Sequence, residues 1–276
     1  MNSRRSAAGG RWSSVVAPLL VIAALGRATP TAMAAEDPIA KARQLYNQRD
    51  FVAAVSVAEQ ARLVPARADS ADLVAARAYL ERFRDSGASD DLTNARDRLR
   101  RLNPDRFIPR ERAEYIIGLG EALYFDGAYG AAANVFDTVL HSPELMTGHA
   151  REQVLDWWAT SLDRDARPRP EMDRQAVYQR MRTRLEDELA VHPGSSAASY
   201  WLAATARAQG DLQGAWDAAQ AGWVRAPLAA DKGAALRADL DRLVQRVIIP
   251  ERARLTAQPP DQLHSDWEKF KARWVK

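Results

Sequence analysis

The sequence predicts an all-α fold made of stacked helical hairpins. From Ile39 onward, apolar residues recur at intervals of three and four positions, which is the spacing of one face of an α-helix. Runs in which apolar and polar residues alternate, the pattern typical of strands, are scarce. One phrase of residue types also occurs twice with the same internal spacing, which indicates a repeated unit. With 276 residues, 47% of them hydrophobic, the chain has ample apolar surface for a core.

The first segment, residues 1–34, has the features of an export signal. Arg4, Arg5 and Arg11 form a positive leader, and a short apolar stretch follows at residues 15–25. Ala32-Met33-Ala34 places small residues at the spacing that signal peptidase needs, so we expect cleavage after Ala34 and a periplasmic or secreted protein. The apolar stretch falls well short of the ~20 residues that cross a bilayer, and no later segment approaches that length. Retention of the segment as an uncleaved anchor is the alternative.

Composition excludes several classes of function. The formal net charge of +3 falls to −1 once residues 1–34 are removed, because that segment holds arginines and no acidic residue. The basic residues that remain are interleaved with acids, so no patch for nucleic acid is predicted. The chain has no cysteine, which excludes disulfides, thiolate zinc sites, a cysteine nucleophile and a lipid-bearing cysteine.

The repeated phrase has a glycine near its centre. From Gly127 and from Gly210, a small alanine follows five residues on, a core position nine on and a large apolar residue thirteen on. The first copy runs Leu119-Gly120, Gly127-Ala128-Tyr129, Ala132, Phe136, Leu140 and Pro143. The second runs Leu202-Ala203, Gly210-Asp211-Leu212, Ala215, Ala219, Trp223 and Pro227. The central glycine can adopt the positive φ that ends a helix, and the small residues allow two helices to approach closely.

This pattern resembles the tetratricopeptide repeat, a helix-turn-helix unit that stacks into a right-handed α-solenoid. Two units are clear, at residues 113–146 and 196–229. Two are degenerate. Residues 35–65 carry Arg49 where glycine is usual; residues 70–104 carry Asp90 there, and residues 82–88 are expected to lengthen their turn. Residues 148–191 predict an irregular hairpin, with helices over 148–163 and 171–191, so the solenoid spans 35–256.

The C-terminal part continues the helices and then closes the stack. Residues 228–255 predict one or two helices that Pro250 interrupts, and Pro259-Pro260 marks a joint within the linker of residues 257–276. The last helix, residues 261–276, carries one narrow apolar stripe: Leu263, Trp267, Phe270 and Trp274. We interpret it as a cap on the open end of the solenoid, with docking into a groove, of this chain or of a partner, as the alternative.

The search for catalytic constellations predicts no enzyme, no cofactor and no metal. The four histidines are scattered, and His149 with Glu152 is the nearest approach to a metal pair. The carboxylates of residues 186–188 follow three arginines on one helix and are interpreted as a solvated, ion-paired face. A rival is an enzyme with a novel site near Trp157-Trp158 and Asp163. It would need convergent titratable groups in one cleft, and the sequence shows none.

The resemblance implies that the first helices of the units form a concave face that binds peptides or proteins. The residues that it assigns to this face are Ile39, Arg43, Tyr46, Ile117, Glu121, Tyr124, Phe125, Tyr200 and Arg207. Family members that grip a terminal carboxylate have lysine and asparagine where this chain has Ile117 and Glu121, so that mode is not expected here. An alternative interpretation is that Tyr124, Tyr200 and Trp201 only pack between hairpins.

We therefore expect a non-enzymatic scaffold or adaptor that binds a protein or peptide in the bacterial cell envelope. The rival is a periplasmic module for a lipid or another apolar small molecule, which a closed, apolar cavity would favour. Neither the partner nor the oligomeric state follows from the sequence.

Overall fold

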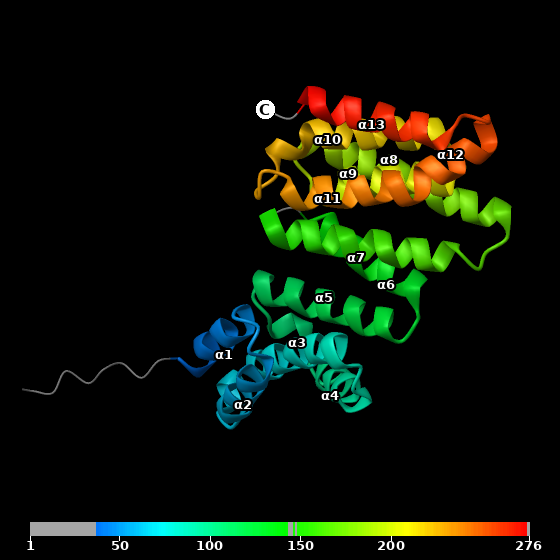
Figure 1. The fold of residues 1–276 in the computed structure, drawn as a ribbon. Helices are drawn as coiled ribbons and strands as arrows, with labels where there is room; N and C mark the ends of the chain where they lie inside the picture. Colours follow the sequence, from blue (N-terminus) through cyan, green and yellow to red (C-terminus); the bar gives the residue numbers. More distant parts are fainter. Residues whose placement is uncertain (1–36, 143–145, 147, 275–276) are drawn as a thin grey trace, which may run out of the picture. The chain divides into compact units, whose positions relative to one another are not determined.

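The computed structural model describes residues 37–142, 146 and 148–274, and within these residues every regular element is helical (Figure 1). The predicted export signal and Pro143 lie outside the described residues. Ten of the helices follow one another as hairpins: α1 (Pro38–Asn47) with α2 (Phe51–Arg62), α3 (Ala68–Ser86) with α4 (Ser89–Leu99), α5 (Pro109–Phe125) with α6 (Tyr129–Leu140), α7 (Gly148–Ala166) with α8 (Glu171–Val191), and α9 (Ser196–Ala208) with α10 (Leu212–Arg225). The chain then forms α11 (Ala234–Leu243), α12 (Ile249–Thr256) and α13 (Pro260–Trp274).

The first helices of the hairpins form a row. Helix α1 contacts α3, α3 contacts α5, α5 contacts α7, α7 contacts α9, and α9 contacts α11. Each second helix packs between the first helix of its own hairpin and that of the next. Figure 1 shows α5 and α7 running side by side in this row. A surface made by the first helices is therefore continuous from one hairpin to the next.

Three hairpin turns have the same backbone geometry. Arg49, Gly127 and Gly210 have φ angles of 63°, 78° and 81°. In each turn the next residue donates its N–H to the carbonyl five residues back: Asp50 to Leu45, Ala128 to Leu123 and Asp211 to Ala206, each at 3.0 Å. This bond and the left-handed residue before it form a Schellman-type helix end. In the degenerate first unit, Arg49 thus adopts the left-handed backbone conformation that Gly127 and Gly210 adopt in the two clear units.

Close packing within a hairpin depends on the small residues. A methyl group at position 120 would lie 2.5 Å from a ring carbon of Phe136, which is itself fully buried. The alanines Ala132, Ala203 and Ala215 are also fully buried. The prediction that these positions let α5 approach α6, and α9 approach α10, is confirmed.

The second hairpin departs from its predicted turn. Residues 82–86 continue α3, and the helix ends at Gly87, which has a φ of 71°. Helix α3 extends this far because Phe83 packs edge-on against Phe125 of α5, with ring centroids 5.0 Å apart. Arg82 also pairs with the buried Asp91 of α4 at 3.1 Å. The prediction of a lengthened turn over residues 82–88 is therefore wrong.

Pro250 does not interrupt its helix. Helix α11 passes into α12 through one π-helical segment, Val244–Ile248, in which the N–H of Ile249 bonds to the carbonyl of Val244. A π-turn widens the backbone by one residue, and Pro250, which has no N–H to donate, occupies a first-turn position of α12. Buried Val244, Ile248 and Ile249 hold this continuous helix against its neighbours.

The last helix, α13, packs its stripe against α10 and α12. Leu263, Trp267 and Phe270 are buried, whereas Trp274 is 51% exposed. The indole N–H of Trp267 donates to Asp241 Oδ1 at 2.8 Å, and Lys271 Nζ donates to the same atom at 2.6 Å. In this structure the apolar stripe is therefore covered mainly by the chain's own helices.

One carboxylate of the 186–188 run is not solvated. Glu188 is 4% exposed and accepts two hydrogen bonds from Arg151 of α7, at 2.8 and 2.6 Å. Burial opposes the charge of Glu188, but Arg151 outweighs it and holds the pKa of the carboxyl below its usual value. The interpretation of the run as a solvated face fails for Glu188, which instead fixes α8 to α7.

Candidate binding pocket

A pocket of about 490 Å³ lies on the row of first helices, between α1, α3, α5 and α7. It is partly open and is lined by both polar and apolar side chains. The lining residues are Arg43, Tyr46, Asn47, Val74, Arg77, Arg110, Ala113, Glu114, Ile117, Glu121, Met146, His149, Ala150, Gln153, Val154 and Trp157. Four successive hairpins thus contribute to one site.

Four of the residues assigned to the binding face meet in this pocket. Arg43 and Tyr46 reach it from α1, and Ile117 and Glu121 reach it from α5. Positions 43 and 46, like positions 117 and 121, are one helical turn apart and share a face of their helix. Helix α3 lies between α1 and α5 in the row, and the pocket above it is bordered by both of these faces.

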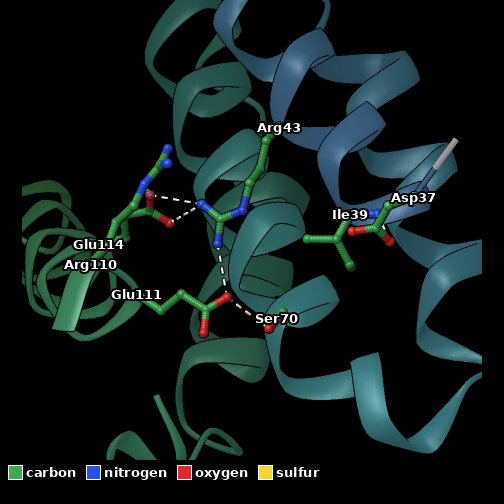
Figure 2. Close-up of polar contacts among 7 residues, drawn as sticks. All are labelled: Asp37, Ile39, Arg43, Ser70, Arg110, Glu111 and Glu114. Atoms are coloured by element: carbon green, nitrogen blue, oxygen red, sulfur yellow. Dashed lines mark hydrogen bonds and ion pairs between the residues drawn. The ribbon is translucent and has the colours of Figure 1, made fainter. Parts of the chain in front are cut away.

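Arg43 is held in an ion-pair network at one edge of the pocket. Figure 2 shows its guanidinium between two carboxylates of α5: Nη1 lies 2.7 and 2.5 Å from the Glu114 oxygens, and Nη2 lies 3.0 Å from Glu111 Oε1. Ser70 of α3 donates to the same Glu111 oxygen at 2.8 Å, and Arg110 Nε donates to Glu114 at 3.0 Å. Arg43 therefore joins α1 to α5 and has little capacity left for a ligand.

Glu121 is the buried acid of the site. Its side chain is 3% exposed, and its Oε2 accepts no hydrogen bond from the described residues. Burial raises the pKa of the Glu121 carboxyl to about 7, although the nearby charge of Arg77 acts to lower it. This carboxyl is therefore easier to protonate than a solvated one, and the Arg77 charge beside it favours its ionised form.

Arg77 and Tyr46 lie beside Glu121. The guanidinium carbon of Arg77 is 4.9 Å from the centroid of the Tyr46 ring, which is a cation–π arrangement. Burial raises the pKa of the Tyr46 hydroxyl, so this side chain stays neutral. Arg77 Nε is buried and donates no hydrogen bond to a described residue. Two buried polar atoms of lining residues, Arg77 Nε and Glu121 Oε2, therefore have no hydrogen-bond partner among the described residues.

The other assigned residues do not line this pocket. Tyr124 and Phe125 pack against Trp157 of α7, with ring centroids 4.7 and 5.7 Å away, which favours a packing role for both. On α9, Arg207 is bonded to Glu251, and Tyr200 lies edge-on to Trp201. Ile39 is part of the first turn of α1, where its N–H donates to Asp37. The nine assigned residues thus do not form one site.

The sequence reasoning missed Arg77 and Trp157. No face residues were assigned to the second unit, because its repeat pattern is weak. A signal was nevertheless present: Arg77 is a lone charge within the apolar run of residues 73–78. Trp157 was considered only for a novel enzyme site, with Trp158 and Asp163. Trp158 is in the core, and Asp163 accepts from Tyr178 and from Arg167, at 3.0 and 2.5 Å.

Other sites weighed from the sequence have structural partners. The sequence suggests Glu152 and His149 as a metal-binding pair. In the structure, Glu152 accepts a hydrogen bond from the N–H of Ala197, at the start of α9, at 2.9 Å. In the described part of the chain, no three histidine or acidic side chains gather as ligands for a metal ion. Over the same residues, none of the helices has both the length and the apolar character needed to cross a bilayer.

No protein-family model matches the chain, and comparisons with curated proteins and with solved structures give no significant match.

Proposed function

We propose that this protein is an exported, non-enzymatic scaffold of the tetratricopeptide-repeat type that binds a peptide or protein segment in the bacterial cell envelope. The repeat assignment is supported by the shared geometry of the turns at Arg49, Gly127 and Gly210 and by the row of contacting first helices. Export rests on the pattern of residues 1–34.

The pocket across α1, α3, α5 and α7 is the observation that carries the binding role. It combines an aromatic side chain, Trp157, and apolar side chains such as Ile117 with charged groups that have unfilled hydrogen-bonding capacity. Peptide segments present the same mixture of apolar side chains and polar backbone groups. The surface that successive hairpins form is also extended enough to contact several residues of a bound peptide.

Binding of a lipid or another apolar small molecule remains the second candidate. A pocket for such a ligand is expected to be enclosed and mostly apolar. The pocket here is partly open, and Arg43, Arg77, Arg110, Glu114 and Glu121 line it. Its volume is nevertheless within the range that small ligands occupy, so the experiment must distinguish the two.

The experiment selects peptides from a displayed random library on the full chain and measures their affinity by calorimetry. Ala150 is exposed on α7 and lines the pocket, so Ala150→Arg fills the pocket from its rim without disturbing the core. Ala131 is an exposed alanine of α6 outside the pocket, and Ala131→Arg is the matched control.

Selected peptides should lose at least about tenfold in affinity with Ala150→Arg and keep it with Ala131→Arg. Native mass spectrometry of the protein from its own cell envelope gives the second arm. An added mass of a few hundred daltons that Ala150→Arg removes, with no peptide selected, would replace the peptide proposal by the small-molecule one.

A further inference from the structure

The pocket separates its polar atoms into two sets. At the α1–α5 edge, Arg43 and Arg110 both donate to Glu114. Deeper in the site, Glu121 Oε2 and Arg77 Nε are both buried, and neither has a hydrogen-bond partner among the described residues. Several other buried polar atoms of the described residues also have no partner, but Arg77 Nε and Glu121 Oε2 are the ones that belong to residues lining this pocket.

These two atoms have opposite hydrogen-bonding roles. The N–H at Arg77 Nε can only donate, whereas an ionised Glu121 can only accept. The two side chains are near enough that the Arg77 charge acts on the pKa of the Glu121 carboxyl. A ligand group that both donates and accepts can therefore satisfy both atoms together.

Charge decides which ligand group fits. The pocket is lined by Arg43, Arg77 and Arg110 and by the carboxyl groups of Glu114 and Glu121, and Glu111 pairs with Arg43, so arginines and carboxyl groups are equal in number. A ligand cation at Glu121 would face Arg77, and a ligand anion at Arg77 would face Glu121. An uncharged group avoids both repulsions and has a smaller desolvation cost.

Building on the proposed peptide-binding function, we infer that the pocket recognises an uncharged amide group, whose N–H donates to Glu121 Oε2 and whose carbonyl accepts from Arg77 Nε. The amide can be that of the peptide main chain or the carboxamide of an asparagine or glutamine. Val74, Ile117 and Trp157 line the same pocket and provide apolar contacts for the carbon atoms beside the amide.

Small probes test this inference on the full chain. Butyramide represents a side-chain carboxamide, N-methylacetamide represents the main chain, and butyrate and butylammonium are ionic probes close in size to butyramide. Binding is titrated by NMR through the indole N–H signals of the tryptophans. We expect an amide probe to bind about tenfold or more tightly than either ion. The two amide probes, compared with each other, distinguish main chain from side chain.

Variants assign the contact to its residues. Glu121→Leu removes the acceptor and should reduce amide binding about tenfold, Ala150→Arg should abolish it, and Ala131→Arg should leave it unchanged. Two results with the unaltered protein would overturn the inference: an ionic probe that binds as tightly as the amides, or the absence of saturable amide binding. Neither readout depends on the folding of a variant.

Failure of this inference can be told from failure of the proposed function. If selected peptides bind, lose affinity with Ala150→Arg and keep it with Glu121→Leu, the site binds peptides without amide recognition at Glu121. If no peptide binds and the amide probes do, the scaffold proposal fails and the pocket is a small-molecule site.

Discussion

A single side chain distinguishes the first hairpin turn from its two counterparts. Arg49 and Gly127 occupy the same left-handed position, and a residue with a Cβ there costs about 1 kcal/mol relative to glycine. Arg49→Gly should therefore stabilise the protein by about 0.5–1 kcal/mol, and Gly127→Val should destabilise it by at least about 1–2 kcal/mol. Urea unfolding followed by circular dichroism measures both changes.

Arg49→Ala is the control for this pair. Arg49 is largely exposed, and its contacts are weak at their distances: 3.9 Å to Asp85 and 5.8 Å from the guanidinium carbon to the centroid of the Phe51 ring. The alanine variant removes both contacts and keeps the cost of the positive φ, so it should stay within about 0.5 kcal/mol of the unaltered protein. Equal stability of the glycine and alanine variants would contradict the backbone explanation.

Glu121 should make stability depend on pH between about 4.5 and 7. Burial raises its pKa from 4.5 in the unfolded chain to about 7 in the folded one. Below pH 4.5 the carboxyl is protonated in both states and has no penalty. As the pH rises to about 7, the unfolded state loses the proton first, so the folded state loses stability, by about 3 kcal/mol in total.

Glu121→Gln removes this titration. The stability of the variant relative to the unaltered protein should therefore rise from pH 4.5 to pH 7 and then level off, as measured by urea unfolding at each pH. Other groups titrate in both proteins and cancel in the difference. A flat difference for Glu121→Gln would mean that the carboxyl is ionised without penalty.

Helix α13 provides its own comparison, because two tryptophans of one stripe differ in burial. Trp267 is fully buried and stacks on Phe270, with its N–H bonded to Asp241, whereas Trp274 is half exposed. Trp267→Ala should cost about 3–5 kcal/mol and Trp274→Ala less than about 1 kcal/mol. Thermal unfolding measures both. Similar small effects would mean that α13 does not stabilise the end of the stack.

Element boundaries show where local sequence signals suffice. The bounds of α8 were predicted as residues 171–191 and are Glu171–Val191, because Pro170 and Pro193 mark both ends. The C-terminal extent of α3 and the continuity of the helix at Pro250 were not predicted, because long-range contacts decide them. Phe83 packs on Phe125 of α5 and so stabilises the last turn of α3. At Pro250, the buried π-helical segment Val244–Ile248 keeps the helix continuous. Tertiary packing overrides a local breaker at Pro250.

Across the whole molecule, the sequence could predict the class of fold and four of the sixteen residues that line the pocket. The turn glycines and small residues define hairpins, and the repeat alignment identifies Arg43, Tyr46, Ile117 and Glu121. It could not identify Arg77, because the second unit lacks the repeat pattern although α3 occupies the same place in the row. It also could not show that Arg43 is occupied by Glu111 and Glu114, since those carboxylates are about seventy residues away.

Contacts between near neighbours also predict how the folded chain opens. The substantial contacts join each helix to helices within three positions of it along the chain, so α1–α4 have no direct contact of this kind with α11–α13. Stability in such an array is roughly the sum of unit and neighbour terms, and one end can open alone. Trp267→Ala should therefore speed amide hydrogen exchange in α11–α13 and leave exchange in α1–α4 unchanged, as mass spectrometry of peptic fragments can measure. Faster exchange of similar size in all helices would show that the array unfolds as one cooperative unit.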